Sequence, residues 1–181
     1  DRLAHKRNGG FFFTSDEHKA LLVRDKSFLD ESIPNGNSVA AMLLLKLYRL
    51  TEDNRFLDLA ECIFTAAAPL MARYPRAGAH LLCALDLYGS TPADIVIIGD
   101  PAQRDMQELL AAAYSGCRPN AVVSGGNPDS RSFEQSARLV PALSNKQKVN
   151  GKAAAYVCVG RACREPVTDP DASGDGDRGG F

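Results

Sequence analysis

The chain has 181 residues, of which 45% are hydrophobic, and its 21 lysines and arginines nearly balance its 22 aspartates and glutamates. A chain of this length can bury roughly 70% of its unfolded surface, so we expect a substantial core. The formal net charge of −1, with no basic run among aromatics, argues against nucleic-acid binding. The longest apolar stretches, such as residues 39–47, are far shorter than the ~20 residues that span a bilayer. No signal peptide is present either, so we expect no membrane insertion.

The cysteine content and the first residues suggest a cytoplasmic fragment. The five cysteines form an odd number, and the first two fall within apolar helical patterns. We therefore predict reduced cysteines and a cytoplasmic location. The sequence begins at Asp1 with residues typical of a helix end. We interpret it as a fragment or a processed piece of a longer protein.

In the first 38 residues we expect two short strands and a polar connection. Gly9 and Gly10 precede an aromatic run at 11–13, which predicts a strand, and residues 21–23 suggest a second. A turn at 34–38 then opens a helix.

Three helices are predicted to follow this connection. The first, at 39–50, is apolar on nearly every face and is therefore expected to be buried, with Asn37 or Ser38 as its N-cap. The second, at 55–74, shows apolar residues at three-and-four spacing; Pro69 should kink or restart it, and Pro75 should end it. A third, at 77–88, is again apolar on most sides. This alternation is typical of a double-layered ring of helices.

The pattern changes to α/β after residue 90. Residues 94–99 form a β-branched run typical of a strand buried on both faces. A helix at 102–114 follows, with Pro101 in its first turn. Two further strands are predicted at 121–124 and 153–159. We therefore divide the chain into helical hairpins at 1–90, a small α/β extension at 91–170 and a disordered tail at 171–181.

The connection at 9–38 is the strongest candidate site. Asp16, Glu17 and His18 could transfer protons, as catalytic residues, while Arg24, Asp30, Asn35 and Asn37 offer donors and acceptors to a sugar-like molecule. In this reading Arg24, Asn35 and Asn37 bind substrate. The alternative is a solvated connection whose polar residues cap helices and fill turns.

Two further features admit a functional or a structural role. His80, near the start of the third helix, could bind substrate or could be a hydrogen-bonded core histidine. Cys158 and Cys163 could form a redox pair if residues 159–162 make a tight turn; otherwise they are small residues packed beside a turn. We predict neither a metal site nor a cofactor.

Several motifs point to a known family. They are Gly9-Gly-Phe-Phe, Pro34-Asn-Gly-Asn-Ser-Val-Ala-Ala, Ile95-Val-Ile-Ile-Gly and Cys163 followed by Pro166-Val-Thr-Asp-Pro. Over residues 8–170 the chain resembles the C-terminal portion of the thioredoxin-domain-containing proteins of the YyaL and spermatogenesis-associated protein 20 family. The resemblance implies a thioredoxin-like domain followed by an (α/α)6 toroid of the six-hairpin glycosidase type, with a carbohydrate-related ancestry.

On this basis we expect a mainly α chain with a small α/β extension, forming part of such a toroid. Its partners would be the thioredoxin-like domain and the other toroid helices of the full-length protein. The function expected is to bind or act on a sugar-like small molecule in the toroid pocket. The alternative is a non-catalytic interaction scaffold for the redox domain. Whether the protein is an enzyme stays open.

Overall fold

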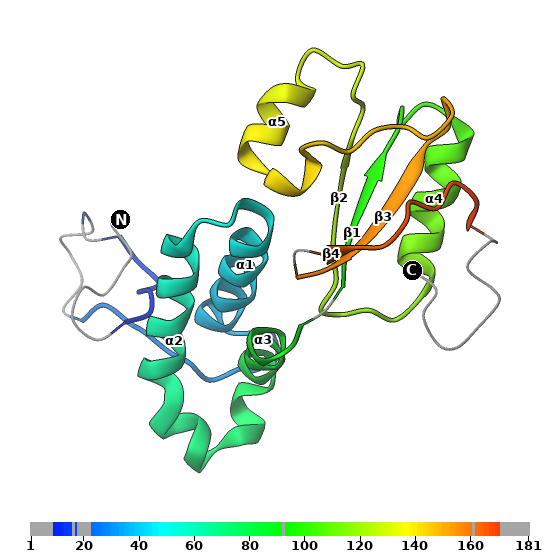
Figure 1. Cartoon of the computed structure of the whole chain (residues 1–181). Helices are drawn as coiled ribbons and strands as arrows, with labels where there is room; N and C mark the ends of the chain where they lie inside the picture. Colours follow the sequence, from blue (N-terminus) through cyan, green and yellow to red (C-terminus); the bar gives the residue numbers. More distant parts are fainter. Residues whose placement is uncertain (1–8, 16, 18–22, 92, 161, 171–181) are drawn as a thin grey trace. The chain divides into compact units, whose positions relative to one another are not determined.

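The computed structural model describes residues 9–15, 17, 23–91, 93–160 and 162–170, and combines helices with a small sheet (Figure 1). The chain divides into two compact units. The first comprises Asp1–Arg49 and Asp53–Ser90, and the second comprises Leu50–Glu52 and Thr91–Phe181. In the described part of the chain, no helix is both long enough and apolar enough to cross a bilayer.

The first unit is helical. It contains α1 (Gly36–Thr51) except for its last two residues, α2 (Asn54–Arg73), the 3-10 turn η1 (Pro75–Gly78) and α3 (Ala79–Gly89). The three α-helices share one core, and α2 buries Ala60, Ile63 and Ala67 along a single face. This spacing confirms the amphipathic pattern predicted for α2, because residues three and four apart lie on the same side of a helix.

The prediction that α1 is buried on nearly every face is wrong. Its inner face packs Ala41, Leu44 and Leu45 into the core, but Val39 is 45% exposed and Leu43 is 55% exposed. The third helix behaves in the same way, and its exposed apolar residues are Leu82, Leu85 and Tyr88. An all-round apolar helix needs neighbours on every side, and the described residues of this unit cover only one side of α1 and α3.

Pro69 and Pro75 have different effects on α2: the helix passes through the first and stops before the second. The helix continues through Pro69 without restarting, contrary to one of the two predicted outcomes. Pro69 and Thr65, whose carbonyl would accept the missing hydrogen bond, are both exposed. Pro75 ends the helix as predicted, since α2 stops at Arg73 and η1 begins with the proline.

The second unit contains a four-stranded sheet in the order β2-β1-β3-β4. The strands are β1 (Ala93–Ile98), β2 (Val122–Gly126), β3 (Ala154–Val159) and β4 (Ala162–Cys163). β1 pairs in parallel with β2 and antiparallel with β3, which in turn pairs antiparallel with β4. The three predicted strands are confirmed to within two residues at each end, whereas the two-residue β4 gave no signal of its own.

Helices cover both faces of this sheet (Figure 1). α4 (Arg104–Ser115) packs against Ile95 and Ile97, while α5 (Phe133–Leu139) and η2 (Pro141–Leu143) lie with Val96 and Ile98 in a second core. Successive residues of a strand point to opposite faces, so two covered faces require an unbroken apolar run. This explains the β-branched run, whose four residues are at most 1% exposed.

The two strands predicted in the first 38 residues are not seen in the described part of the chain. Residues 11–13 do not form the predicted strand; Phe11 makes an isolated bridge, and the backbone N–H of Phe13 donates to the carbonyl of Asp25 at 3.0 Å. In the second predicted strand, residues 21 and 22 lie outside the described residues, as does the tail at 171–181.

Candidate functional site

The N-terminal end of α1 is held by the side chain of Asn37. This residue is only 2% exposed, and its Oδ1 accepts a hydrogen bond from the backbone N–H of Phe11 at 2.6 Å. Its Nδ2 donates to the carbonyls of Phe11 and Ser27, each at 2.9 Å. Both Nδ2 hydrogens are therefore used, and Asn37 fastens the preceding connection to α1.

Asp30 joins the starts of α1 and α3. Its Oδ1 accepts hydrogen bonds from the backbone of Asn35 at 2.7 Å and from the Ser38 hydroxyl at 3.1 Å, while Oδ2 accepts from the backbone of His80 at 2.8 Å. The backbone N–H of Asp30 donates to Ala77 at 2.6 Å. A carboxylate at two helix N-termini also complements the positive ends of their dipoles.

These contacts determine the protonation of Asp30. Partial burial acts to raise the pKa of this carboxyl. The opposing hydrogen bonds from Asn35, His80 and Ser38, together with the charge interaction with His80, outweigh it, so the pKa lies below its ordinary value. Asp30 is therefore a carboxylate at neutral pH.

Asn35 is the N-cap of α1, in place of the predicted Asn37 or Ser38. Its Oδ1 accepts from the backbone N–H of Asn37 at 2.8 Å, and its carbonyl accepts the first helical bond, from Val39, at 3.0 Å. The prediction failed because Asn35, Asn37 and Ser38 are all good capping residues. Asn37 and Ser38 instead turn inward, where Phe11 and Asp30 bind them.

An aromatic groove of about 390 Å³ opens beside this network. Its lining residues are Phe11, Phe12, Phe13, Gly36, Asn37, Ala40, Leu43 and Leu44. Arg24 supports the wall, because its guanidinium lies 4.1 Å from the centre of the Phe12 ring and its Nε donates to the carbonyl of Thr14 at 3.1 Å. The aromatic run predicted as a strand therefore forms a groove wall, and this role was missed.

Gly9 and Gly10 directly precede the phenylalanines that line the groove. Both have positive φ, at 63° and 73°. A Cβ on Gly9 would overlap the carbonyl oxygen of Cys62 on α2. Glycine is therefore required at Gly9 both for its backbone conformation and for the close approach to α2.

The structure brings together only some of the predicted site residues. Asp16 and His18 lie outside the described residues, and Glu17 is exposed. Asn35 and Asn37 lie in the hydrogen-bonded network described above. His80 is half-buried and joins the network through its backbone.

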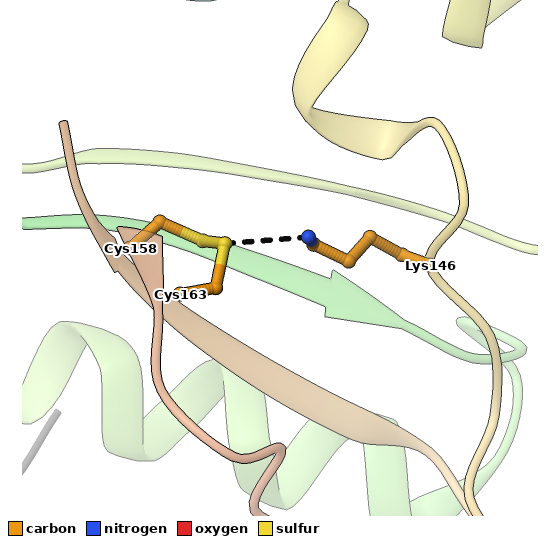
Figure 2. The surroundings of a disulfide bond; sticks show 3 residues. All are labelled: Lys146, Cys158 and Cys163. Atoms are coloured by element: carbon orange, nitrogen blue, oxygen red, sulfur yellow. Dashed lines mark hydrogen bonds between the residues drawn. A yellow bond between two sulfur atoms is a disulfide. The ribbon is translucent and has the colours of Figure 1, made fainter. Parts of the chain in front are cut away.

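The cysteine pair lies in the second unit, at the end of the sheet. Cys158 and Cys163 face each other in the β3–β4 register and form a disulfide bond (Figure 2). Gly160, with φ of 60°, lies in the turn between them. The pairing corrects the prediction that the cysteines are reduced, since Cys62, Cys83 and Cys117 alone are free.

Lys146 reaches this disulfide from the loop after η2. Its Nζ lies 3.3 Å from Sγ of Cys163 (Figure 2). Within the described part of the chain, no three histidine, cysteine or acidic side chains are grouped to hold a metal ion.

Comparisons with known proteins identify relatives of this chain. It is 36% identical over 172 residues to spermatogenesis-associated protein 20 of Rattus norvegicus, and 34% identical over 172 residues to the Homo sapiens protein. Each match covers 94% of this chain and 22% of the relative. The Mus musculus protein is 35% identical over 165 residues, covering 91% of this chain and 21% of the relative. No family model and no solved structure matches the chain.

The chain thus spans about a fifth of the length of the curated relatives it matches. Its matched residues correspond to a segment of those longer proteins. The similarity extends over both units, because it covers nearly the whole chain. The chain therefore belongs to the spermatogenesis-associated protein 20 family.

Proposed function

We propose that the helical unit is part of an (α/α)6 toroid near the C-terminal end of the full-length protein, and that the aromatic groove binds a sugar-like small molecule. The observation that carries this proposal is the groove at the N-terminal end of α1. Its volume of about 390 Å³ lies within the roughly 300–1,000 Å³ of small-molecule sites.

The lining of the groove suits a molecule with one apolar face. Three consecutive phenylalanines, at 11–13, and the α1 residues Leu43 and Leu44 provide hydrophobic walls, and only Gly36 and Asn37 are not hydrophobic. A pyranose ring presents C–H groups on its faces and hydroxyls around its edge. The C–H face would pack on the aromatic walls, while the hydroxyls reach the rim.

The polar residues take separate parts in this proposal. Asn37 and Asp30 hold the groove in shape, because their hydrogen bonds fix the connection to α1 and α3. Glu17 follows the aromatic wall closely in the chain and remains our candidate for proton transfer, together with Asp16 and His18. In this proposal the polar groups at the rim of the groove determine which sugar binds and which reaction follows.

The test uses the full-length protein and a panel of monosaccharides and disaccharides, with binding measured by isothermal titration calorimetry. Phe13 is 56% exposed, so Phe13→Ala should leave the fold intact while removing part of the wall. Tyr74→Ala is the matched control, since Tyr74 is 49% exposed and does not line the groove. We expect Phe13→Ala to weaken sugar binding by about tenfold, which corresponds to a loss of ~1.4 kcal/mol of binding free energy. The control should leave the affinity unchanged. Absence of any sugar binding, or equal effects of the two variants, would contradict the proposal.

A second observation favours the scaffold alternative. A groove of about 310 Å³ lies on α2 and α3, and its lining residues are Phe64, Thr65, Ala68, Met71, Leu81, Leu82 and Leu85. Leu82 and Leu85 are 38% and 44% exposed. Exposed apolar patches of this kind mark interaction surfaces. In this alternative the patch packs against the rest of the full-length chain and supports a thioredoxin-like domain without binding sugar.

Size-exclusion chromatography with light scattering tests this alternative on the 181-residue chain. We expect the isolated chain to self-associate and Leu85→Lys to reduce that association. The matched control is Leu139→Lys, on a residue that is 68% exposed in the second unit. In the full-length protein Leu85→Lys should lower the melting temperature. No change in either protein would argue against a covered α2–α3 surface.

A further inference from the structure

We propose that Cys158 and Cys163 form a thiol–disulfide exchange site, at which a protein or small-molecule dithiol is oxidised. The site lies in the second unit and is separate from the aromatic groove of the first unit. The proposal rests on the unequal exposure of the two sulfurs, the short loop that they close and the lysine beside one of them.

The two cysteines differ in their access to a partner. Cys163 is exposed on the two-residue strand β4, whereas Cys158 is only 7% exposed within β3. A partner thiolate can therefore reach Sγ of Cys163 and not that of Cys158. In an exchange pair the exposed sulfur receives the attack and carries the mixed disulfide, while its buried neighbour leaves.

A purely structural role accounts poorly for the bond. The cysteines are separated by five positions, and the β3–β4 register already pairs them. The stabilisation that a disulfide gives by restricting the unfolded chain grows with the length of the loop that it closes. A loop this short gains less from the bond than a longer loop would, so reduction of the bond costs comparatively little stability.

Lys146 supplies the charge that such chemistry needs. Its Nζ lies 3.3 Å from Sγ of Cys163, and an ammonium at this distance favours the thiolate over the thiol when the bond is reduced. This charge therefore favours the departure of Cys163 as a thiolate.

Tyr156 positions this lysine. Lys146 Nζ lies 5.0 Å from the centre of the Tyr156 ring. The Tyr156 hydroxyl donates to the carbonyl of Gln147 at 2.8 Å and accepts from its backbone N–H at 3.3 Å. The loop is therefore fastened to β3, on the strand that also carries Cys158.

The dithiol is oxidised in two successive exchange steps. A thiolate of the dithiol attacks Sγ of Cys163 and forms a mixed disulfide; the bond to Cys158 breaks, and its electron pair leaves on Cys158, which takes up a proton. The second thiol of the partner loses its proton to solvent and attacks the partner's first sulfur. Cys163 then leaves as a thiolate beside Lys146. Two electrons pass from the dithiol, which becomes a disulfide, to the cysteine pair.

The first experiment asks whether the pair exchanges. It uses the full chain with Cys62→Ser, Cys83→Ser and Cys117→Ser, which removes the three free, exposed cysteines. The protein is equilibrated in glutathione redox buffers, quenched in acid and labelled with a mass-tagged maleimide. We expect reversible conversion between disulfide and dithiol across these buffers. A bond that stays oxidised in all of them is structural and would overturn the proposal.

The second experiment asks which sulfur reacts. In the same background, Cys158→Ser leaves only Cys163, and Cys163→Ser leaves only Cys158. We expect glutathione disulfide to form a mixed disulfide with Cys163 at least tenfold faster than with Cys158, because only Cys163 is exposed. Circular dichroism establishes that both variants are folded. Equal rates in folded variants would contradict the assignment.

The third experiment tests Lys146 through the alkylation of Cys163 by iodoacetamide, a neutral reagent, in the Cys158→Ser background. An ordinary thiol is about 3% thiolate at pH 7, and one that titrates one pH unit lower is about 24%. The weaker nucleophilicity of the more acidic thiol removes roughly two-thirds of that gain, which leaves about threefold. We therefore expect Lys146→Met to slow alkylation about threefold and to move the pH profile upward, and Lys146→Arg to restore both.

Lys148→Met is the matched control, because Lys148 Nζ binds Asp129 at 2.6 Å instead of a sulfur. It should leave alkylation unchanged. If Lys146→Met leaves the rate and the pH profile unchanged, or if the control has an equal effect, the lysine plays no part in the exchange and the proposal fails.

Discussion

Replacing Asn37 by alanine should destabilise the helical unit while leaving the phenylalanine and leucine walls of the groove in place. The substitution removes three hydrogen bonds, two with the backbone of Phe11 and one with that of Ser27. Each is worth about 1 kcal/mol net, so the expected loss is about 3 kcal/mol of unfolding free energy. Most of the side chain is inaccessible to water, so solvent cannot readily replace these bonds.

Hydrogen exchange measures this loss locally. In the native protein the amide of Phe11 is bonded to Asn37, and a loss of about 3 kcal/mol corresponds to roughly 100-fold faster exchange. Urea unfolding followed by circular dichroism gives the matching global value. Asn54→Ala is the control, because Asn54 is exposed at the start of α2, and it should change stability by at most about 0.5 kcal/mol. If Asn37→Ala changes stability no more than the control does, Asn37 does not fasten the connection to α1.

Three further predictions concern other parts of the fold. Because the pKa of Asp30 is lowered in the folded protein, its carboxylate stabilises the fold above the ordinary carboxyl range, and this stabilisation is lost as the pH falls through the pKa of the folded state. The free energy of unfolding should therefore fall more steeply with acidification in the wild type than in Asp30→Asn. Gly9→Ala should cost about 1–3 kcal/mol, because it combines a positive φ with overlap against Cys62, whereas Gly89→Ala meets open space and should be close to neutral. Ile97→Ala should cost about 2–5 kcal/mol, since Ile97 is 1% exposed.

One result would contradict each of these three predictions. Parallel acid-unfolding curves for the wild type and Asp30→Asn would remove the carboxylate from the stability of the unit. Equal melting temperatures for Gly9→Ala and Gly89→Ala would show that the close approach to α2 is not required. An Ile97→Ala variant within 1 kcal/mol of the wild type in urea would mean that the face of β1 toward α4 is not tightly packed.

The elements with a strong local pattern could be predicted from the sequence. Within residues 94–99, positions 95–98 are all β-branched, and such a run is typical of a strand covered on two faces; β1 confirms it. The helix starts were less certain, because Asn35, Asn37 and Ser38 all suit an N-cap. Only the partners of Asn37, at Phe11 and Ser27, decide between them, and Phe11 lies 26 positions away.

The parts of the site that were missed depend on contacts between distant residues. The phenylalanines at 11–13 have the composition of a strand, yet the described unit offers them no sheet to join, and they line a groove with α1 instead. The cysteine pairing could be foreseen only as a possibility, because it requires Gly160 to turn the chain and β4 to pair with β3. Lys146 gave no sequence signal at all, since it reaches Cys163 from 17 positions away.

The central place of β1 in the sheet has a consequence for synthesis. β1 emerges from the ribosome first, but its antiparallel neighbour β3 ends at Val159, and the two pair from Ala93 with Val159 to Ile98 with Ala154. Until those residues emerge, one edge of an apolar strand has no partner and is open to other chains. Any nascent or truncated form that stops before Ala154 therefore exposes this edge of β1, and β3 protects it from pairing with other chains.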